Sequence, residues 1–478
     1  MQDFSNLAKQ DCKIYSFLQS HFARLENAMP FNTLVQEKIL DFEQQGIPKV
    51  FPRDLALSPI QRPERGNLAQ VVVGTRRCGK TYRLYQEMHD IVHAGYAPTS
   101  ILYFNFEDER LKPYTTELLS DVVDTFFAMH PDAKEQGCFL FFDEIQEVPD
   151  WGLFLRRLID STKATVYVTG SSSKMLSHEL KSEFRGRSLA RELFPMGFSE
   201  YVRYTTGTTM HAEDGFSATD QAVLRNALNT YLLRGGFIAP LSLPAPDGML
   251  LLQEYAYRTV AMDVIERFNL RTPQVATSFL ARCLASSGRE LSINKVANEF
   301  KSRGVSTSRE TLSNLLSYYE QAYLLFSLPD LSRSLADNAR SSSKVYAIDP
   351  GMFAAFTRAS AQETGQRLET AVFNKLRRTT PSVRAGSLAR LTFEHESKSH
   401  EIDFVTGDAL LYDVYQLVQV SVNHDDPKTR ARELSALEDG MAKYGIKEST
   451  LVTMDTEETV AVSSGTVRIL PAWKWLLD

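Results

Sequence analysis

Cysteine is scarce in this chain, and long apolar runs are absent from it. The 478 residues include four cysteines, Cys12, Cys78, Cys138 and Cys283, which are far apart and form no CxxC pair. This excludes a disulfide framework and a cysteine-based zinc knuckle. No apolar run approaches the roughly 18 residues that span a bilayer, and residues 1–18 lack the basic and apolar regions of a secretory signal. We therefore expect a cytoplasmic protein with no membrane partner.

No charge of one sign dominates. The 53 Lys and Arg residues against 59 Asp and Glu give a net charge of -6, which excludes coating of nucleic acid by bulk attraction but leaves room for a local basic groove. The 24 glycines and 19 prolines are close to the globular average, which argues against collagen-like and disordered classes. At about 150 residues per domain, the length predicts roughly three domains.

The chain has no internal repeat, so changes of pattern mark the expected domains. We expect a helical segment over residues 1–66 and alternating strands and helices over 67–210. A mainly helical region follows over 211–344, and short strands return in a tail over 345–478. The tail also has a helical stretch, which predicts a separate α/β or α+β unit.

Four short apolar runs, rich in Val, Ile, Tyr and Phe, alternate with amphipathic helical stretches in the second region. They are residues 69–73, 100–106, 138–142 and 164–170. Parallel strands need long crossovers and are buried on both faces, so this pattern predicts an α/β fold with a parallel sheet. In the third region, residues 291–328 hold two helical stretches broken at Gly304 and then an apolar strand, an order typical of a winged helix-turn-helix.

A full GxxxxGK[ST] motif follows the first predicted strand and opens a helical stretch. In that context the glycines let the backbone curl, so that amide groups and the helix N-terminus face a phosphate. Lys80 would reach the β- and γ-phosphates, and the Thr81 hydroxyl would bind Mg²⁺. We therefore predict a site for ATP and Mg²⁺ formed by Gly74, Thr75, Arg76, Arg77, Cys78, Gly79, Lys80 and Thr81.

Two carboxylates end the third predicted strand, at the edge where parallel sheets hold their ligands. Asp143 is placed for the Mg²⁺ shell, and Glu144 is left to polarise an attacking water as a general base. Asn105 ends the second strand, and Thr169 and Ser171 end the fourth. We expect these three side chains to meet the γ-phosphate or its water, with plain strand-end turn chemistry as the alternative.

Two arginines in EFRGRSLARELF, Arg185 and Arg187, are candidates for neutralising charge on the transferred phosphoryl group. They would act either in cis or from a neighbouring subunit. For Arg187 the alternative is an ordinary surface salt bridge.

Six segments in order, GTRRCGKT, YFNFEDERL, FLFFDEIQEVPDW, TGSSSKML, FRGRSLARELFPMGFSEY and YLLRGGFIAP, resemble a large group of prokaryotic AAA-type ATPases over about residues 50–478. The resemblance implies an AAA+ P-loop core, a winged-helix middle and a tail with a restriction-endonuclease-like fold. It implies that Thr169 or Ser171 is the sensor residue at the end of the fourth strand. It also implies that Arg187 is the arginine of the family's Gly-Arg pair, here Gly186-Arg187. AAA-type sites usually lie between subunits, with an arginine supplied in trans, but the resemblance leaves a homo-oligomer, a monomer and a small assembly open. Where members often have an Arg-Asp pair, this chain has Met262 and Asp263.

A restriction-type nuclease fold places a helix Glu, a strand Asp and a [DE/Q]xK strand together, so that carboxylates bind Mg²⁺ and the lysine activates water. In the tail, Glu369 stands at the helix Glu position and Asp403 at the strand Asp position. Gln419 and Ser421 stand at the first and last positions of the [DE/Q]xK strand. Ser421 cannot replace the lysine, and Gln419 gives the metal no anionic ligand. We predict a degenerate site kept for binding or assembly, with an active nuclease as the alternative. A lysine that has migrated, such as Lys428, would compensate.

Basic residues are in local excess at the start of the tail. Between residues 367 and 398, seven Lys or Arg stand against three Glu, a surplus of four; the seven are Arg367, Lys375, Arg377, Arg378, Arg384, Arg390 and Lys398. Together with the predicted helix-turn-helix, this suggests a surface that meets phosphates, with DNA or another nucleic acid as partner. A protein partner is the alternative.

The leading hypothesis is an ATP-hydrolysing switch or motor whose nucleotide state repositions the winged-helix region and the tail on that partner. The first alternative is a signalling or defence scaffold that holds nucleotide with very slow turnover. The second is an ATP-regulated DNA nuclease.

Overall fold

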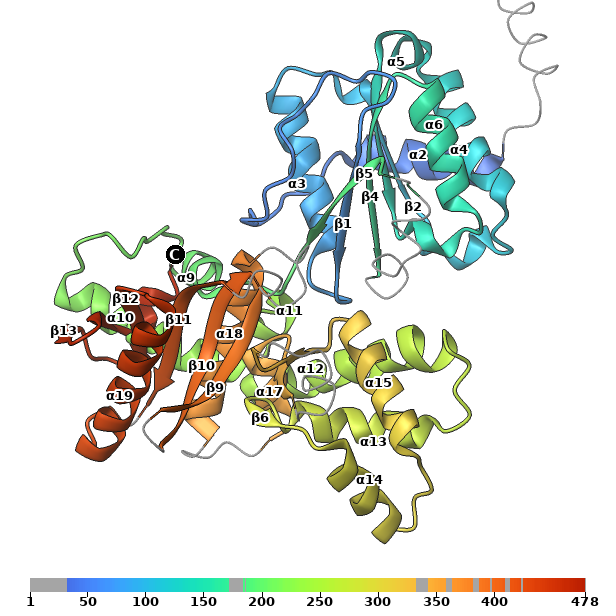
Figure 1. Cartoon of the computed structure of the whole chain (residues 1–478). Helices are drawn as coiled ribbons and strands as arrows, with labels where there is room; N and C mark the ends of the chain where they lie inside the picture. Colours follow the sequence, from blue (N-terminus) through green and yellow to red (C-terminus); the bar gives the residue numbers. More distant parts are fainter. Residues whose placement is uncertain are drawn as a thin grey trace, which may run out of the picture.

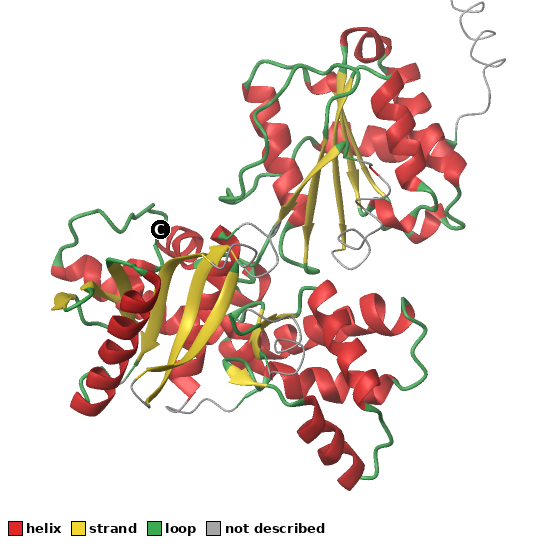
Figure 2. Cartoon of the chain, in the orientation of Figure 1, coloured by secondary structure: helices red, strands yellow, loops and turns green. Residues whose placement is uncertain are grey.

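The computed structural model describes residues 32–171, 184, 186–331, 343–357, 363–380, 387–395, 398–408, 413–422 and 424–477 (Figures 1 and 2). Arg185, Arg384 and the helices expected before residue 32 lie outside the described residues, as do the side chains of Ser171 and Lys398. Figure 1 shows a parallel-sheet region, coloured blue to green, next to a helical region and a strand-rich tail.

The first region is built on five parallel strands, which confirms the predicted α/β class. The strands lie in the order β2-β3-β4-β1-β5. The four predicted strands are present because their apolar runs are buried on both faces. The pattern does not predict β5, since its SLARE sequence lies half exposed at the sheet edge. The bounds are β1 (Ala69–Gly74), β2 (Ile101–Asn105), β3 (Cys138–Asp143), β4 (Ala164–Ser171) and β5 (Ser188–Glu192).

Helices cover both faces of this sheet, as Figure 1 shows. α3 (Lys80–His93) packs on one face, against the side of β1 that carries Val72. On the other face lie α2 (Thr33–Gln45), α4 (Thr116–Met129) and α6 (Trp151–Ser161). Shorter helical pieces complete the connections: η1 (Pro98–Ser100), η2 (Glu109–Leu111), α5 (Pro131–Gln136) and η3 (Ile145–Glu147).

Residues 46–66 form no helix, so the helical expectation for 1–66 is wrong over this stretch and holds within α2. The segment contains four prolines, at positions 48, 52, 59 and 63. Proline fixes φ and removes an amide donor, which prevents a continuous helix. The segment runs extended instead and packs Ile47, Leu55 and Ile60 on the α3 face of the sheet.

The helical region follows β5. Its first helices lead into a π-helical segment, η4 (Val260–Glu266), that continues directly from α12. The helices before η4 are α9 (Phe198–Thr206), α10 (Ala218–Arg234), α11 (Ile238–Leu241) and α12 (Ala245–Thr259). The helix after η4 is α13 (Pro273–Leu284).

The predicted helix, Gly304 break, helix and strand are all present. α14 (Ile293–Ser302) and α15 (Arg309–Gln321) flank the break, where Gly304 has a φ of 76°, a value that favours glycine. Strand β7 (Leu325–Leu328) then joins β6 (Arg289–Glu290) and β8 (Lys344–Ala347) in a three-stranded sheet of order β6-β8-β7. This part is drawn in yellow and olive in Figure 1.

The tail is a mixed sheet between two helices. α18 (Glu363–Thr379) packs on the face that carries Phe404 and Val418, and α19 (Pro427–Tyr444) packs on the face that carries Ile402 and Leu417. The six strands lie in the order β13-β14-β12-β11-β10-β9. They are β9 (Leu388–His395), β10 (Lys398–Asp408), β11 (Asp413–Ser421), β12 (Glu448–Thr453), β13 (Glu458–Val462) and β14 (Gly465–Pro471), with short helices α17 (Pro350–Ala355) and α20 (Ala472–Trp475) beside them.

Helix α18 ties the tail to the parallel-sheet region. Arg377 donates two hydrogen bonds to Glu192, the last residue of β5, at 2.8 and 2.9 Å, and Arg378 donates to the carbonyl oxygen of Pro195 at 2.6 Å. Apolar side chains of α9 and α10 join those of α18 in one hydrophobic cluster. Within the described residues, no helix has the length and hydrophobicity needed to span a bilayer.

Candidate nucleotide-binding site

The P-loop connects the end of β1 to the start of α3, at the carboxyl edge of the parallel sheet. Its tight turn needs glycine at both ends. At Gly74, a Cβ would lie 2.2 Å from the carbonyl oxygen of Leu193, and Gly79 has a φ of 101°. Arg77 also has a positive φ, 66°. The chain thus holds a curled backbone in front of a helix N-terminus, an arrangement suited to an anion.

Lys80 turns back over this loop. Its Nζ donates to the carbonyl oxygens of Gly74 at 3.3 Å and Thr75 at 3.4 Å, and lies 3.5 Å from Oε1 of Glu144. Burial opposes charge on the ammonium group, but Glu144 and other neighbours more than offset it, so the pKa of Lys80 is raised. The side chain is therefore a buried cation at neutral pH.

Asp143 is fully buried at the end of β3 and accepts four side-chain hydrogen bonds. Thr81 donates to it at 2.7 Å, Tyr103 at 2.9 Å and Asn105 at 3.4 Å, and the Thr169 hydroxyl also donates. Burial raises the pKa of this carboxyl, and the adjacent Glu144 adds to the effect. Thr81 and Asp143 together present the hard oxygen ligands that Mg²⁺ prefers.

Glu144 has a strained, left-handed backbone with a φ of 54°. Its amide donates to the Thr169 hydroxyl at 3.1 Å, and its Oε2 accepts from Nε2 of Gln146 at 2.6 Å. Burial alone would raise the pKa of this carboxyl, but Lys80 and the Gln146 hydrogen bond hold it below the ordinary value. Glu144 is therefore a charged carboxylate that two partners keep in place.

A buried ion pair between Arg53 and Glu200 supports the P-loop, and the sequence does not predict it. We call this pair the Glu200 clamp. Arg53 donates to both carboxylate oxygens of Glu200, at 2.8 and 3.1 Å, and to the carbonyl oxygens of Cys78 at 2.8 Å and Phe194 at 2.7 Å. Burial opposes ionisation of Glu200, but Arg53 reverses the effect and lowers its pKa to about 2. Pairing across 147 residues leaves no local pattern that could reveal it.

The Glu200 clamp makes stability depend on pH in a defined direction. Because the pKa of Glu200 is about 2 in the folded chain and ordinarily 4.5, its contribution is complete above the ordinary pKa and is lost as pH falls toward 2. We expect Glu200→Gln to lose about 3–5 kcal/mol at pH 7, since Arg53 stays buried without an anion. Urea unfolding at pH 7 and pH 3 measures this, with the exposed Glu135→Gln as control. A variant that is as stable as the parent at pH 7 would contradict the assignment.

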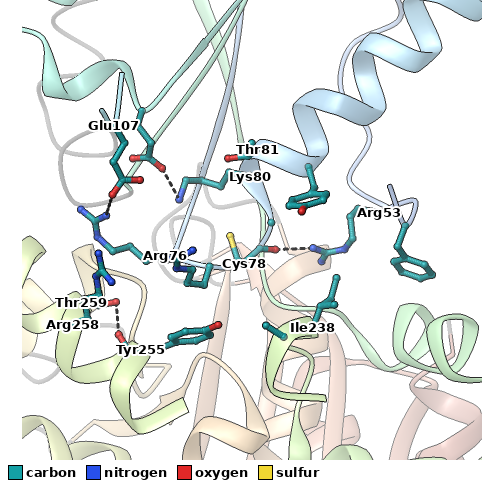
Figure 3. Close-up of a pocket in the computed structure, with 16 residues that line it drawn as sticks. Arg53, Arg76, Cys78, Lys80, Thr81, Glu107, Ile238, Tyr255, Arg258 and Thr259 are labelled. Atoms are coloured by element: carbon teal, nitrogen blue, oxygen red, sulfur yellow. Dashed lines mark hydrogen bonds and ion pairs between the residues drawn. The ribbon is translucent and has the colours of Figure 1, made fainter. Parts of the chain in front are cut away.

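A cavity of about 540 Å³ opens over the P-loop (Figure 3). The P-loop forms one wall, and Tyr255, Arg258 and Thr259 of α12 face it from the helical region. Phe51 and Ile238 line a further side. The cavity offers cations beside the P-loop and apolar surface away from it, which matches the charged and apolar parts of a nucleotide.

Ser171 and Arg187 are two further residues that the sequence predicts for this site. Ser171 ends β4, but its side chain lies outside the description. Arg187 directly precedes β5, and β5 runs parallel to β1 with Ser188 opposite Ala69. Arg187 is therefore at the edge where β1 begins, away from the P-loop, and its side chain pairs with Asp160 at the surface. The expectation that Arg187 acts in cis is wrong for this reason, and only action on a neighbouring subunit stays a prediction.

Met262 and Asp263 lie in η4, and Asp263 contacts the P-loop itself. Its carboxylate accepts two hydrogen bonds from the Arg76 guanidinium, at 2.9 and 3.1 Å. Another guanidinium nitrogen of Arg76 lies 3.6 Å from Oε1 of Glu107, a contact drawn in Figure 3. The pairing thus joins the nucleotide site to the helical region.

The tail brings Glu369 and Asp403 together, as predicted, but with a lysine that the sequence pattern does not indicate. Nζ of Lys344, on β8, lies 3.1 Å from Glu369, 3.2 Å from Asp403 and 2.8 Å from Glu401. Lys428, the migrated lysine considered from the sequence, is exposed at the start of α19. The lysine expected on the third strand is therefore replaced by a residue outside the tail sheet.

Gln419, another predicted residue of the tail site, is bound to partners other than Lys344. The Gln419 side chain accepts from the amide of Asp403 at 3.0 Å and donates to Glu433 at 2.6 Å, so both its polar atoms are engaged. Ser421 is buried at the end of β11. Among the described residues, no group of three or more His, Cys, Asp or Glu side chains is arranged to hold a metal ion.

The basic surplus at the start of the tail is largely engaged in internal contacts. Arg377 and Arg378 bind the segment after β5, and Arg390 pairs with Asp330 and with Glu290 at 2.7 Å. Arg367 is buried, and Lys375 donates to the carbonyl oxygen of Trp475. Five of the seven basic residues are thus buried or engaged in internal contacts, and Arg384 and the side chain of Lys398 lie outside the described residues, so the phosphate-binding surface stays a prediction.

A parallel α/β sheet with a P-loop after its first strand and an acid pair after its third defines a P-loop nucleotide-binding protein. A family model described as an AAA domain matches residues 66–202, and one described as a domain of unknown function matches residues 225–363. An uncharacterised protein of Methanocaldococcus jannaschii is 31% identical over 474 residues, which cover 97% of this chain and 99% of that protein. The chain belongs to the same family as this protein.

More distant relatives also match. An uncharacterised protein of Haemophilus influenzae is 26% identical over 345 residues, 72% of this chain and 81% of that protein. Among solved structures, the Aeropyrum pernix ORC2 protein in its ADP form is 11% identical, with a TM-score of 0.28 and coverage of 55% and 81% of the two chains. A katanin structure is 16% identical, with a TM-score of 0.19 and 33% of this chain covered. The match spans about half of the katanin chain, 52%.

Proposed function

We propose that the chain binds ATP with Mg²⁺ at the P-loop and hydrolyses it. The observation that carries this proposal is the convergence of Lys80, Thr81, Asp143 and Glu144 at one edge of the sheet, each held by named hydrogen bonds. The P-loop amides and Lys80 would hold the β- and γ-phosphates. Thr81 and Asp143 would hold Mg²⁺, which supplies positive charge to the phosphates when bound.

Glu144 is the residue proposed to handle the proton. Its carboxylate is charged because Lys80 and Gln146 hold its pKa low. A charged carboxylate can accept a proton from water as that water attacks the γ-phosphate, with release of phosphate and ADP. Thr169 and Asn105 are proposed to position this water, since Thr169 contacts the amide of Glu144 and both contact Asp143.

We propose that hydrolysis drives a switch, with domains at 67–210, 211–344 and 345–478. The cavity supports this proposal because P-loop and α12 residues form its opposite walls, so an occupant would contact both. Helices α14 and α15 are proposed to form a winged helix that meets a nucleic acid or a protein. Lys295, Lys301 and Arg309 are exposed on these helices, which favours a phosphate-bearing partner.

Hydrolysis kinetics separate the switch from a scaffold that holds nucleotide. Purified full chain is mixed with a several-fold molar excess of labelled Mg-ATP, and ADP formation and ADP release are followed separately. Repeated turnover that stops on removal of Mg²⁺ supports the switch. Product held for hours would support a scaffold, and ATP left unbound and uncleaved would overturn both.

For the tail we propose binding or assembly in place of DNA cleavage. Gln419 supports this, because it gives a metal no anionic ligand and both its polar atoms are already bound, to the Asp403 amide and to Glu433. Burial and the neighbouring Glu369 raise the pKa of Asp403, which further weakens it as a metal ligand. Plasmid incubated with Mn²⁺, with or without ATP, should therefore stay uncut. Cleavage by the parent that disappears in Asp403→Ala would contradict this.

A further inference from the structure

Arg76 is a P-loop residue whose side chain binds an acid outside the loop. It directly follows Thr75, whose carbonyl oxygen accepts a hydrogen bond from Lys80. Lys80 also pairs with Glu144, and Arg76, Lys80 and Glu144 all line the cavity over the P-loop.

Of the two acids that contact Arg76, Glu107 and Asp263, the second belongs to a different region of the chain. Asp263 lies 187 residues away in the π-helical segment η4, and only 3% of its side chain is exposed. π-helical segments are rare and occur often at functional sites. η4 continues α12, which supplies Tyr255, Arg258 and Thr259 to the wall of the cavity. A change at Asp263 would therefore act on the wall that faces the nucleotide.

A guanidinium group binds a carboxylate or a phosphate through the same pair of parallel hydrogen bonds. Asp263 uses this geometry, with both of its oxygens bound to Arg76. A triphosphate in the P-loop would bring a second ligand of the same kind, with more negative charge, within reach of the same side chain. A diphosphate would lack that terminal group.

We propose that Arg76 exchanges Asp263 for the terminal phosphate of bound ATP, so that ATP and not ADP releases the P-loop from η4. This inference rests on the proposed nucleotide site. Arg76 then serves as an arginine supplied in cis that neutralises charge on the γ-phosphate. Asp263 is left as a buried carboxylate without its cation, which is costly and drives η4 and α12 to rearrange.

Hydrogen–deuterium exchange of the full chain tests this exchange of partners. Amides of residues 255–268 are compared without nucleotide, with Mg-ADP and with the non-hydrolysable analogue Mg-AMP-PNP. We expect exchange in this segment to be at least about five times faster with Mg-AMP-PNP than with Mg-ADP. Equal exchange in both complexes, with both nucleotides shown to be bound, would overturn the proposal. If neither nucleotide binds, the proposed function fails first.

Variants of Asp263 give a second, independent readout. Asp263→Asn should show fast exchange in all three states, because its amide cannot hold the guanidinium as a carboxylate does. Asp263→Glu should restore the difference between nucleotides at least in part. The matched control is Asp247→Asn, an exposed acid on α12, which should behave as the parent. A parent-like nucleotide response in a folded Asp263→Asn variant would contradict the role of the pair.

Discussion

Replacing Glu144 with Gln is expected to slow ATP hydrolysis by about 10²–10⁴-fold, the usual contribution of a general base, while ATP still binds. Glutamine has nearly the same shape and can still contact Gln146, but it cannot accept a proton from the attacking water. It also removes the negative partner of Lys80, 3.5 Å away. That change favours phosphate binding, since Lys80 would then have fewer anions competing for its charge.

Single-turnover hydrolysis and equilibrium ATP binding, measured on the same preparation, check this expectation. The matched control is the exposed Glu135→Gln, which should hydrolyse ATP as the parent does. Hydrolysis at the parent rate in Glu144→Gln would show that another group activates the water. The combination of bound ATP and lost turnover is the specific signature of this residue.

Replacing Lys80 with Ala is expected to abolish measurable ATP binding. Each hydrogen bond from a charged donor contributes about 1.5–3 kcal/mol, so losing those to two phosphates weakens binding by about 10²-fold or more. Alanine also leaves Glu144 without its ammonium partner, and the pKa of that carboxyl should rise because Lys80 lowers it.

Isothermal titration with Mg-ATP measures the loss of affinity, and circular dichroism shows that the variant is folded. Lys80→Met, which keeps the apolar stem of the side chain, separates loss of charge from loss of packing. Both variants should fail to bind. Parent-like affinity in folded Lys80→Met would mean that phosphates bind elsewhere.

Local patterns predict much of this fold and most of the proposed phosphate site. The apolar runs of β1 to β4 are buried on both faces, so composition alone indicates parallel strands. The P-loop and the acid pair are contiguous in sequence, so their chemistry can be read directly. β5 escapes prediction because it lies at the sheet edge, half exposed. The stretch after α2 departs from the helical expectation for residues 1–66 because its prolines prevent a continuous helix.

The remaining parts of the site depend on partners far apart in sequence. Arg53 pairs with Glu200, and Arg76 pairs with Asp263, across 147 and 187 residues. No spacing rule connects such positions, so the sequence places Arg76 in the P-loop but does not show which acid it binds. The segment that contains Glu200 is part of the family resemblance, but the resemblance does not say what the glutamate binds.

The tail shows the same limit. The pattern locates Glu369 and Asp403 correctly, yet the cation between them is Lys344 of β8, a strand of the helical region. The basic residues nearby look free in sequence, although Arg377 and Arg390 are bound to acids of other regions. Local charge counts therefore overstate the surface that is left for a nucleic acid.

A crystal structure with Mg-AMP-PNP is the most direct test of the central claim. We predict the triphosphate in the P-loop, with Lys80 on its phosphates and with Mg²⁺ beside Thr81 and Asp143. Nucleotide bound elsewhere, or a P-loop left empty at saturating ligand with Asp143 and Glu144 turned away from it, would contradict the account.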